Sequence, residues 1–417
     1  MKQNQTFFGR VKEGIFDMCY IWLKEVRNVV KDEGMLIFFI LVPLIYPILY
    51  SWIYNNEVAR EVPVAVVDMS HSKESRTYIR NYDASPNVAV SYRCNSIEEA
   101  DNLIGHQKCY GIVYIPSDFS TSLNRMEQTT VTIYCNMSFL LYYKAIYQTA
   151  AMVSNEMNSK IQVSLSGNST DRQDEILTQP LAYEEVALFN ETGGYGNFII
   201  PGVLMLVLQQ TLLLGIGLSA GTARENNRFR NLVPISKHYN GIFRIVLGKS
   251  ACYSMVYAVI AAFEVLVVPR LFNFVHIGSP SAVFGIMVPY ILACVFFGMF
   301  FSCIIRHREN VMLLIVFTSV PFLFLSGVSW PQNNIPGAWQ GIACLIPSTF
   351  GVRAYVRINS MGATLADVNQ EYVALWIQVL AYFFLTCLTY RHQINLTRRH
   401  ELARREEIKG KVKMEEG

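Results

Sequence analysis

The sequence predicts a membrane protein: an all-α transmembrane bundle of six helices with an inserted α/β extracytoplasmic domain. Of its 417 residues, 52% are hydrophobic and only 16% are charged, whereas a soluble domain has about 25% charged residues. This composition argues against a soluble enzyme, and the apolar excess excludes a disordered chain. The net charge of +3 is too small to indicate binding to nucleic acid.

Six segments are long enough to cross a bilayer, which requires about 20 mostly apolar residues. They are Met35–Tyr54, Phe198–Leu218, Ser250–Val268, Val283–Ile305, Val311–Ser329 and Tyr372–Tyr390. The first is not expected to be a signal peptide, because it has full span length and no small-residue cleavage site follows it before Asn55.

The distribution of lysine and arginine orients these spans. With six spans both termini share one side, and 22 of the 35 basic residues lie on that side, in residues 1–34, 220–249, 306–310 and 391–417. Because short cytoplasmic loops carry an excess of lysine and arginine, both termini are expected in the cytoplasm. The last of these stretches, residues 391–417, is expected to be a charged cytoplasmic tail.

Residues 55–197, between the first two spans, are polar enough to form the extracytoplasmic domain. Four short runs rich in β-branched or aromatic residues are expected as strands: Val62–Val67, Val88–Tyr92, Gly111–Ile115 and Thr130–Tyr134. Helix-like pieces lie between them at Ser72–Tyr82, Ser96–Gly105 and Ser117–Met126, and Ser96 with Glu99 forms a capping box. Strands alternating with helices predict βαβ units, followed by two helices within residues 138–191.

The nine cysteines include no zinc-binding spacing, so neither a metal site nor a cofactor bound by this chain is expected. One disulfide among Cys94, Cys109 and Cys135 stays open.

Residues 1–34 are predicted to form an amphipathic helix at the cytoplasmic interface. Its apolar residues recur at steps of three and four: Phe8, Val11, Ile15, Cys19, Trp22, Val26 and Val29. The alternative is that this helix is a passive anchor.

Residues 221–249 form a basic cytoplasmic stretch between the second and third spans. We expect Thr222 to cap a short helix that Pro234 ends, which a cytoplasmic partner could grip; the alternative is that its charges only orient the spans. Gly248-Lys249-Ser250 resembles the end of a phosphate-binding loop, but the first glycine of that motif is replaced by Phe243. No strand is expected before it, so it cannot bind ATP in this way.

Residues 331–368 are predicted to be a re-entrant segment on the outer side. The fifth span ends in Ser326-Gly327, and Pro331, Pro336 and Pro347 interrupt the chain beyond it. The run from 335 to 346 is too short to span, so it should dip into the outer leaflet and line or cap a pathway. The alternative is a packed external loop.

Glu264, inside the third span, is a further pathway candidate, because carboxylates within a membrane are functional candidates by default. It is expected to reach water or to pair with Arg270.

At this point the chain resembles an ABC-2-type transporter permease with a large domain after the first span. The segments Lys24–Leu49 and Tyr110–Leu123 are similar to the family's opening and to a signature of its external domain. In the coupling segment, usually E-R-E-x-G-T-x-E-x-L-x-x-x-P followed by G-K, five positions match: Arg224, Glu225, Leu232, Gly248 and Lys249. Pro234 lies close to the expected proline, whereas Ala223, Asn227-Arg228 and Arg230 depart from the pattern.

The resemblance implies a permease subunit of an ATP-binding cassette exporter, not itself an enzyme, in a bacterial inner membrane. Such a subunit forms a homodimer or a paired permease, and a separate ABC ATP-binding subunit binds ATP and magnesium. Membrane lipid and a periplasmic adaptor are further implied partners. The residues implied in coupling are Thr222, Arg224, Glu225, Arg228, Leu232 and Pro234, and an amphipathic or hydrophobic substrate would move outward.

Two other classes stay open from the residues alone. A membrane-anchored sensor would use the extracytoplasmic domain to bind a ligand, but residues 391–417 are short and mostly charged for an output domain. An intramembrane enzyme such as a lipid transferase would need clusters of polar catalytic residues in the spans, and Glu264 alone is thin support for it.

Overall fold

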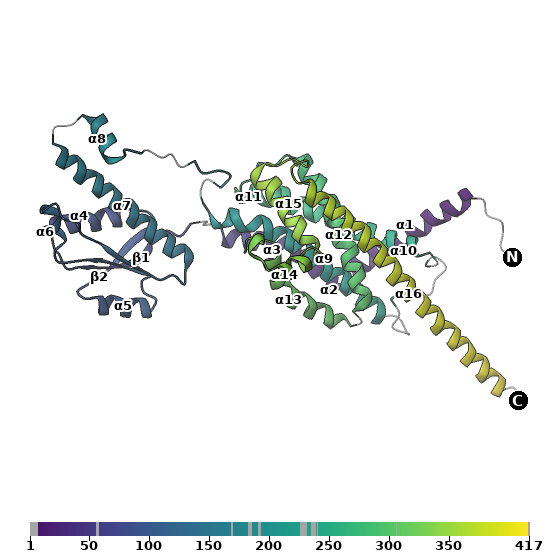
Figure 1. Cartoon of the computed structure of the whole chain (residues 1–417). Coiled ribbons are helices and arrows are strands. Elements are labelled where there is room, and N and C mark those ends of the chain that lie inside the picture. Colours follow the sequence, from purple (N-terminus) through teal and green to yellow (C-terminus); the bar gives the residue numbers. More distant parts are fainter. Residues whose placement is uncertain are drawn as a thin grey trace. The chain divides into compact units, whose positions relative to one another are not determined.

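The chain folds into two compact units, Met1–Asn55 with Phe189–Gly417, and Asn56–Leu188, called here the helical unit and the inserted unit (Figure 1). The structure, a computed structural model, describes residues 7–55, 58–167, 170–181, 186–190, 193–225, 232–234, 239, 241–305 and 307–415.

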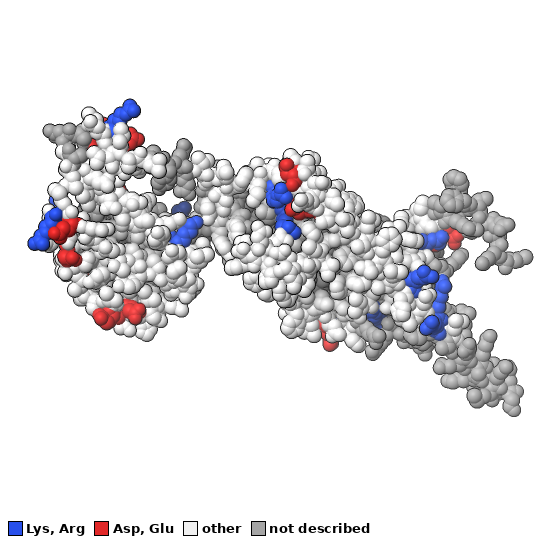
Figure 2. All heavy atoms as spheres, viewed as in Figure 1, with Lys and Arg blue, Asp and Glu red and all other residues white. Residues whose placement is uncertain are grey.

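Among the described residues of the helical unit, six helices are long and apolar enough to cross a membrane, judged by length and composition. They are Glu33–Ile53, Tyr195–Glu225, Ile242–Leu271, Pro280–Ile304, Arg308–Leu325 and Asn369–Arg399. Each overlaps one of the six apolar segments of the sequence. Figure 2 shows the result on one face: a wide band of this unit carries few charged side chains.

Two of these helices are composite. The first comprises α2 (Glu33–Met35), the π-helical turn η1 (Leu36–Leu41) and α3 (Val42–Ile53), and the third comprises α10 (Ile242–Ala262), η3 (Phe263–Val267) and α11 (Val268–Leu271). The others are α9 (Tyr195–Glu225), α12 (Pro280–Ile304), α13 (Arg308–Leu325) and α16 (Asn369–Glu415), so the helix of the last span continues through most of the expected charged tail.

The core of the helical unit forms around α9, whose side chains are buried along most of its length. Small residues let its neighbours approach: a Cβ added at Gly215 would lie 1.9 Å from the Phe39 ring, and one at Gly217 would lie 2.4 Å from Val311. The fifth span ends earlier than expected, at Leu325 rather than Ser329. Gly327 adopts a φ of +87°, a left-handed conformation in which glycine ends helices readily.

Three further helices complete this unit. α1 (Phe7–Lys31) precedes the first span, α14 (Gly337–Ala343) follows the short turn η4 (Gln332–Asn334), and α15 (Pro347–Met361) precedes α16.

The inserted unit is an α/β fold with a four-stranded sheet of order β2-β1-β3-β4. The strands are β1 (Val62–Asp68), β2 (Val88–Cys94), β3 (Gly111–Ile115) and β4 (Thr132–Cys135). β1 pairs in parallel with β2 and β3, and β4 is antiparallel to β3. Each strand overlaps a run that the sequence marked as β-rich.

Helices cover both faces of this sheet (Figure 1). α4 (Lys73–Asp83), α6 (Phe119–Asn124) and α7 (Leu140–Ser166) pack on one face, α5 (Ile97–Gly105) packs on the other, and α8 (Asp171–Thr178) follows α7. Ser96 caps α5 by accepting a hydrogen bond from the Glu99 amide at 3.2 Å. The Glu99 carboxylate accepts from the amide of Asn95 rather than from that of Ser96, so the capping box is shifted by one residue.

The three cysteines of this unit are free thiols. Cys94 on β2 and Cys109 before β3 pack in the cluster on one face of the sheet, whereas Cys135 packs against the cluster on the other face. The fold therefore separates Cys135 from the other two, and none of the three forms a disulfide in this structure.

Candidate coupling site

The helix α1 has two different faces. Asp17, Ile21, Glu25 and Val29 are buried at intervals of four residues, one face of a helix, and α1 packs mainly against α10. Of the expected apolar stripe, Val29 is buried, Trp22 and Val26 pack partly against the core, and Ile15 and Cys19 are exposed. Leu23, outside the stripe, is also exposed. The helix therefore packs through a face that contains two carboxylates and leaves apolar side chains outside, as suits a membrane interface.

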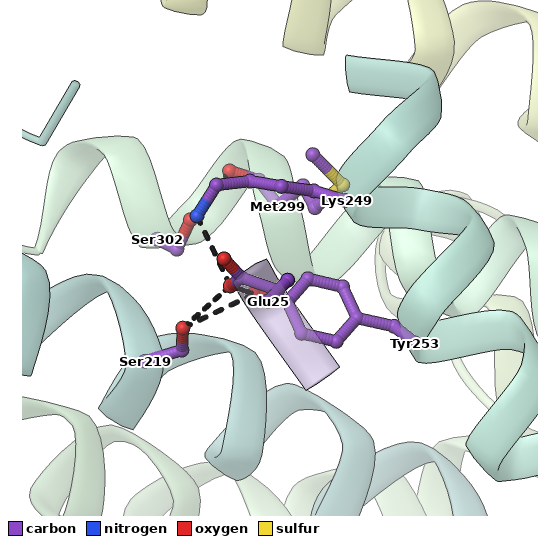
Figure 3. Close-up of polar contacts among 6 residues, drawn as sticks. All are labelled: Glu25, Ser219, Lys249, Tyr253, Met299 and Ser302. Carbon is purple, nitrogen blue, oxygen red and sulfur yellow. Dashed lines mark hydrogen bonds and ion pairs between the residues drawn. The ribbon is translucent and has the colours of Figure 1, made fainter. Parts of the chain in front are cut away.

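Glu25 lies at the centre of a buried polar cluster drawn from three helices (Figure 3). Its carboxylate forms an ion pair with Lys249 of α10 at 3.1 Å and accepts a hydrogen bond from Ser219 of α9 at 2.8 Å. Tyr253 of α10 also donates to it. Ser302 of α12 lies beside the cluster and donates to the Met299 carbonyl at 2.7 Å (Figure 3).

The electrostatics of this cluster favour an ionised Glu25. Burial opposes ionisation, but the charge of Lys249 and the hydrogen bonds from Tyr253, Ser219 and Lys249 outweigh it and hold the pKa of this carboxyl below its usual range. The pair is almost enclosed, with side chains 6% (Lys249) and 2% (Glu25) exposed. A pair this dry costs much to break, because the remaining charge would be buried alone.

Asp32 forms a second junction, between α1 and the first span. Its carboxylate caps α2 by accepting from the amides of Gly34 and Met35. It also accepts from the hydroxyl of Thr222 at 2.7 Å and pairs with Arg308 of α13 at 2.9 Å. Partial burial opposes ionisation of Asp32, but these contacts outweigh it and together hold the pKa of Asp32 below its usual range.

Arg224 joins the last turn of α9 to the end of α12. Its guanidinium is buried and donates to the carbonyl oxygens of Cys303, at 2.9 Å, and Ile305. The last carbonyls of a helix lack intrahelical partners and carry partial negative charge, so a cation there stabilises the helix end. A further ion pair, Arg244 with Asp17 at 2.5 Å, ties the start of α10 to α1.

The residues expected in coupling do not share one environment in the structure. Thr222 does not cap a separate helix, because α9 runs through it to Glu225 and its hydroxyl is taken by Asp32. Glu225 is exposed, Leu232 is buried in the core of the helical unit and Pro234 is half-buried. Arg228 lies outside the described residues.

Sequence reasoning missed the acidic half of this site. Asp17 and Glu25 are one turn either side of Ile21, so they fall on one helix face. The predicted apolar stripe shares Val29 with this face, but it includes neither carboxylate. Lys249 was noted as part of a phosphate-binding motif that does not fit and as a match to the coupling segment, but without a partner. Its neighbour Gly248 packs so closely that an added Cβ would lie 2.9 Å from the Met18 carbonyl oxygen.

The outer candidates surround a different feature, an apolar hollow of about 300 Å³ between α13 and α14. It is lined by Pro321, Phe324, Leu325, Trp330, Ile335 and Trp339. Ser326 and Gly327 follow α13, Pro331 precedes η4 and Pro336 precedes α14, so these four residues border the hollow without lining it.

Pro347 begins α15, where the chain is docked on two spanning helices. The amide of Ser348 donates to Gln209 of α9 at 2.6 Å, and Gln378 and Tyr382 of α16 donate to the carbonyls of Cys344 and Leu345. The segment is therefore packed at this point against the membrane-spanning helices.

Glu264 does not reach solvent or pair with Arg270, contrary to expectation. It is fully buried in the π-helical turn η3, whereas Arg270 is exposed. Its two carboxylate oxygens have no hydrogen-bond partner within the part of the chain that the structure describes.

These helices and their polar junctions define an integral membrane protein with several spanning helices, whose ends are tied together at one side by one buried ion pair and two partly buried ones. Residues 34–388 match the family described as ABC-2 family transporter protein. The chain therefore belongs to this family and is a transmembrane permease of an ABC transporter, a class that works with an ABC ATP-binding partner.

Curated relatives with similar sequences carry matching descriptions. "Inner membrane transport permease YhhJ" of Escherichia coli (strain K12) is 22% identical over 389 residues, covering 89% of this chain and 96% of the relative. "Probable multidrug ABC transporter permease YbhR" of the same strain is 20% identical, covering 78% and 84%. "Linearmycin resistance permease protein LnrN" of Bacillus subtilis (strain 168) is 21% identical, covering 85% and 93%.

Proposed function

We propose that this permease exports an amphipathic or hydrophobic substrate, driven by a separate ATP-binding subunit that docks on residues 221–249. A homodimer or a paired permease completes the pathway, and the inserted unit lies outside the membrane, where an adaptor can contact it. The observation that carries this proposal is the buried polar junction among α1, α9, α10, α12 and α13. The named relatives for multidrug and linearmycin resistance support export of such compounds.

The junction supports coupling because it is short and stiff. A partner that displaces the residues after Glu225 also displaces the last turn of α9. In this turn Arg224 donates hydrogen bonds to the end of α12, and Thr222 donates a hydrogen bond to Asp32. Asp32 in turn holds Arg308 at the start of α13. A displacement at this one place therefore reaches the ends of four helices through hydrogen-bonded contacts.

The orientation follows from charge. Lysine and arginine are concentrated at the side of the spans where α1 begins and α16 ends, which the positive-inside rule assigns to the cytoplasm. In a bacterium this membrane is the inner one, and the inserted unit is then periplasmic.

The direct test is co-purification of the tagged chain from its native operon, with an assay of vanadate-sensitive ATP hydrolysis. The expected result is an ABC ATP-binding subunit that purifies with the wild type and is lost in Glu225→Arg, because Glu225 is exposed at the end of α9. Glu175→Arg, the same substitution at an exposed site of the inserted unit, is the control and should retain the partner. A chain that purifies alone and supports no ATP hydrolysis would favour a sensor instead.

A second test addresses orientation. Two single-cysteine variants, one with the exposed native Cys19 of α1 and one with Ser159→Cys at a half-buried position of α7, are treated with a membrane-impermeant thiol reagent. From the outside only the cysteine at 159 should react in intact cells. Labelling of Cys19 from the outside would reverse the topology and the proposed direction of coupling.

A further inference from the structure

The inserted unit exposes a run of apolar side chains where β4 leads into α7. Met137, Phe139, Leu140 and Leu141 are 65%, 41%, 71% and 41% exposed. Residues 137–141 are called here the apolar tip. Soluble domains seldom expose apolar side chains in one contiguous group, and such a group marks a contact with a protein or a membrane.

The apolar tip is an ordered part of the fold. The ring of Phe139 lies against those of Tyr110 and Tyr142, with centroids 5.4 Å and 5.6 Å away. At the other end of the turn, the amide of Ser138 donates to the side-chain oxygen of Asn136 at 3.0 Å. The fold therefore holds these apolar side chains outward in a fixed turn rather than folding them into its core.

The tip lies beside the point where the chain enters the sheet. The amide of Tyr110 donates to the Pro63 carbonyl at 3.0 Å, and the Tyr110 carbonyl accepts from the amide of Asn136 at 2.9 Å. Pro63 is the second residue of β1, so two successive backbone hydrogen bonds join the base of the tip to the start of this strand. β1, β2 and β3 are parallel, and all three begin at this edge of the sheet.

The length of the chain ties this edge to the membrane. The first spanning helix ends at Ile53 and β1 begins at Val62, and nine residue steps reach about 30 Å at full extension. The opposite edge, where β1 ends at Asp68, is about 20 Å from this one at the rise of a β-strand. The tip is therefore on the membrane-proximal edge, whichever side of the membrane the inserted unit occupies.

The charge of the segment suits a phospholipid surface. From Gln128 to Asn155 the chain contains no acidic residue, and its one charged residue is Lys144, which is exposed one turn after Leu140. Segments that enter the headgroup region combine exposed aromatic and aliphatic side chains with basic residues that attract anionic lipids. A carboxylate would be repelled there, and this segment has none.

We propose that the apolar tip contacts the bilayer, with the side chains of Met137, Phe139, Leu140 and Leu141 in the headgroup region of the leaflet on its own side. Lys144 lies among the lipid phosphates beside them. The contact holds the edge of the sheet at which β1 begins against the membrane and directs the opposite edge into the aqueous phase. This inference goes beyond the proposed export and does not depend on its direction or on the ATP-binding subunit.

The test measures the distance of the tip from lipid in the full-length permease. The exposed Cys19 and Cys344 are replaced by serine, Leu140→Cys is labelled with the fluorescent dye NBD, and the protein is placed in nanodiscs of phosphatidylcholine and phosphatidylglycerol. The labelling of the same protein without Leu140→Cys is subtracted. Lipids with a doxyl quencher close to the headgroup should reduce the NBD fluorescence by about half or more.

The matched control is a probe at the opposite edge of the sheet. Met69 directly follows β1, donates its amide to the Ile115 carbonyl at 3.0 Å and is 44% exposed. A dye on Met69→Cys is therefore attached to an exposed apolar position of the same unit, but about 20 Å from the tip. Its fluorescence should be unchanged by the quencher lipids.

A charge reversal tests the cause of the contact. With the dye on Leu141→Cys, Leu140→Asp should at least halve the quenching, because a carboxylate opposes entry into an anionic headgroup region. Leu177→Asp, the same substitution at a position of α8 that is 49% exposed, should leave the quenching unchanged. Both positions are on the surface, so neither variant removes a core side chain.

The inference is overturned if the dye at the tip is not quenched, if the dye on Met69→Cys is quenched equally, or if Leu140→Asp has no effect. A dye at the tip that is shielded from aqueous iodide but is not quenched by lipid would indicate a protein contact, and it also overturns the inference. Quenching confined to the tip, in a permease that transports no amphiphile, supports the inference while refuting the proposed export.

Discussion

Replacing Lys249 with methionine should destabilise the helical unit by about 3–5 kcal/mol, because it leaves Glu25 buried without its cation. The structure sets this magnitude. The Glu25 side chain is 2% exposed, so water cannot replace the lost ammonium group. Ser219 and Tyr253 still donate to the carboxylate, but two neutral hydroxyls do not neutralise it.

The double variant Glu25→Gln with Lys249→Met should recover most of that loss. It removes both charges, and replacing a whole buried pair by neutral residues of similar size is often close to neutral. The interaction energy from the full double-mutant cycle should therefore exceed about 2 kcal/mol.

Stability is measured by reversible unfolding in mixed micelles as SDS is added. The control is Lys160→Met, because the ion pair between Lys160 and Glu156 is 67% and 52% exposed, and an exposed pair contributes about 1 kcal/mol or less. A cost for Lys249→Met no larger than for Lys160→Met, or an interaction energy near zero, would refute the account of a dry ion pair joining α1 to α10.

Three further predictions concern separate parts of the molecule. The pKa of Asp32 is held below its ordinary 3.8, so the ionised carboxylate stabilises the fold fully above that pH and loses this effect as the pH falls further. The free energies of unfolding of the wild type and Asp32→Asn should therefore differ at pH 6 and approach each other toward pH 3. A difference that stays constant with pH would exclude this contribution. Gly215→Ala should cost about 1–3 kcal/mol by crowding Phe39, whereas Gly341→Ala, which meets no atom within 4 Å, should be neutral or stabilise by up to about 1 kcal/mol in the same SDS titration; equal effects would contradict the packing. Residues 56–188 should fold alone, as judged by circular dichroism, and Ile115→Ala should then lower their stability by about 2–5 kcal/mol in urea; a fragment without a cooperative transition would show that the two units depend on each other.

The spanning helices and strands were predictable because their signals are local. A run of about 20 apolar residues predicts a spanning helix, and a run of four to seven β-branched residues between turns predicts a strand. Both patterns can be recognised from consecutive residues alone. The end of α13 was predicted four residues too late. The prediction followed the hydrophobicity of the residues, which does not indicate the left-handed backbone conformation of Gly327.

The coupling site was only half predictable, because its contacts join distant parts of the chain. Glu25 and Lys249 are 224 residues apart, and the sequence around each residue gives no indication that the two form a pair. Thr222 is a residue type typical of a helix cap, but α9 continues through it. Its hydroxyl instead donates a hydrogen bond to Asp32, 190 residues away. Glu264 was found from its position in an apolar segment, but its burial without a partner among the described residues depends on the packing of residues that are distant in the sequence.

The two faces of α1 allow a final test of how this helix is held. Ile21 is fully buried against α10, whereas Leu23, two residues later, is 59% exposed. If the protein-facing side contains Asp17, Ile21 and Glu25, then Ile21→Ala should cost about 2–5 kcal/mol in the SDS titration, and Leu23→Ala should stay within about 0.5 kcal/mol.

A third variant, Leu23→Gln, tests the contact of α1 with the membrane. In lipid vesicles the exposed apolar face has acyl chains to contact, so Leu23→Gln should loosen α1 from the bilayer and increase its cleavage by protease, with Glu25 and Lys249 still paired. If Leu23→Ala were instead as costly in micelles as Ile21→Ala, the side of α1 that contains Leu23 would be the protein-facing side. The ion pairs of Asp17 and Glu25 with α10 could not then form, and coupling through α1 would need a different route.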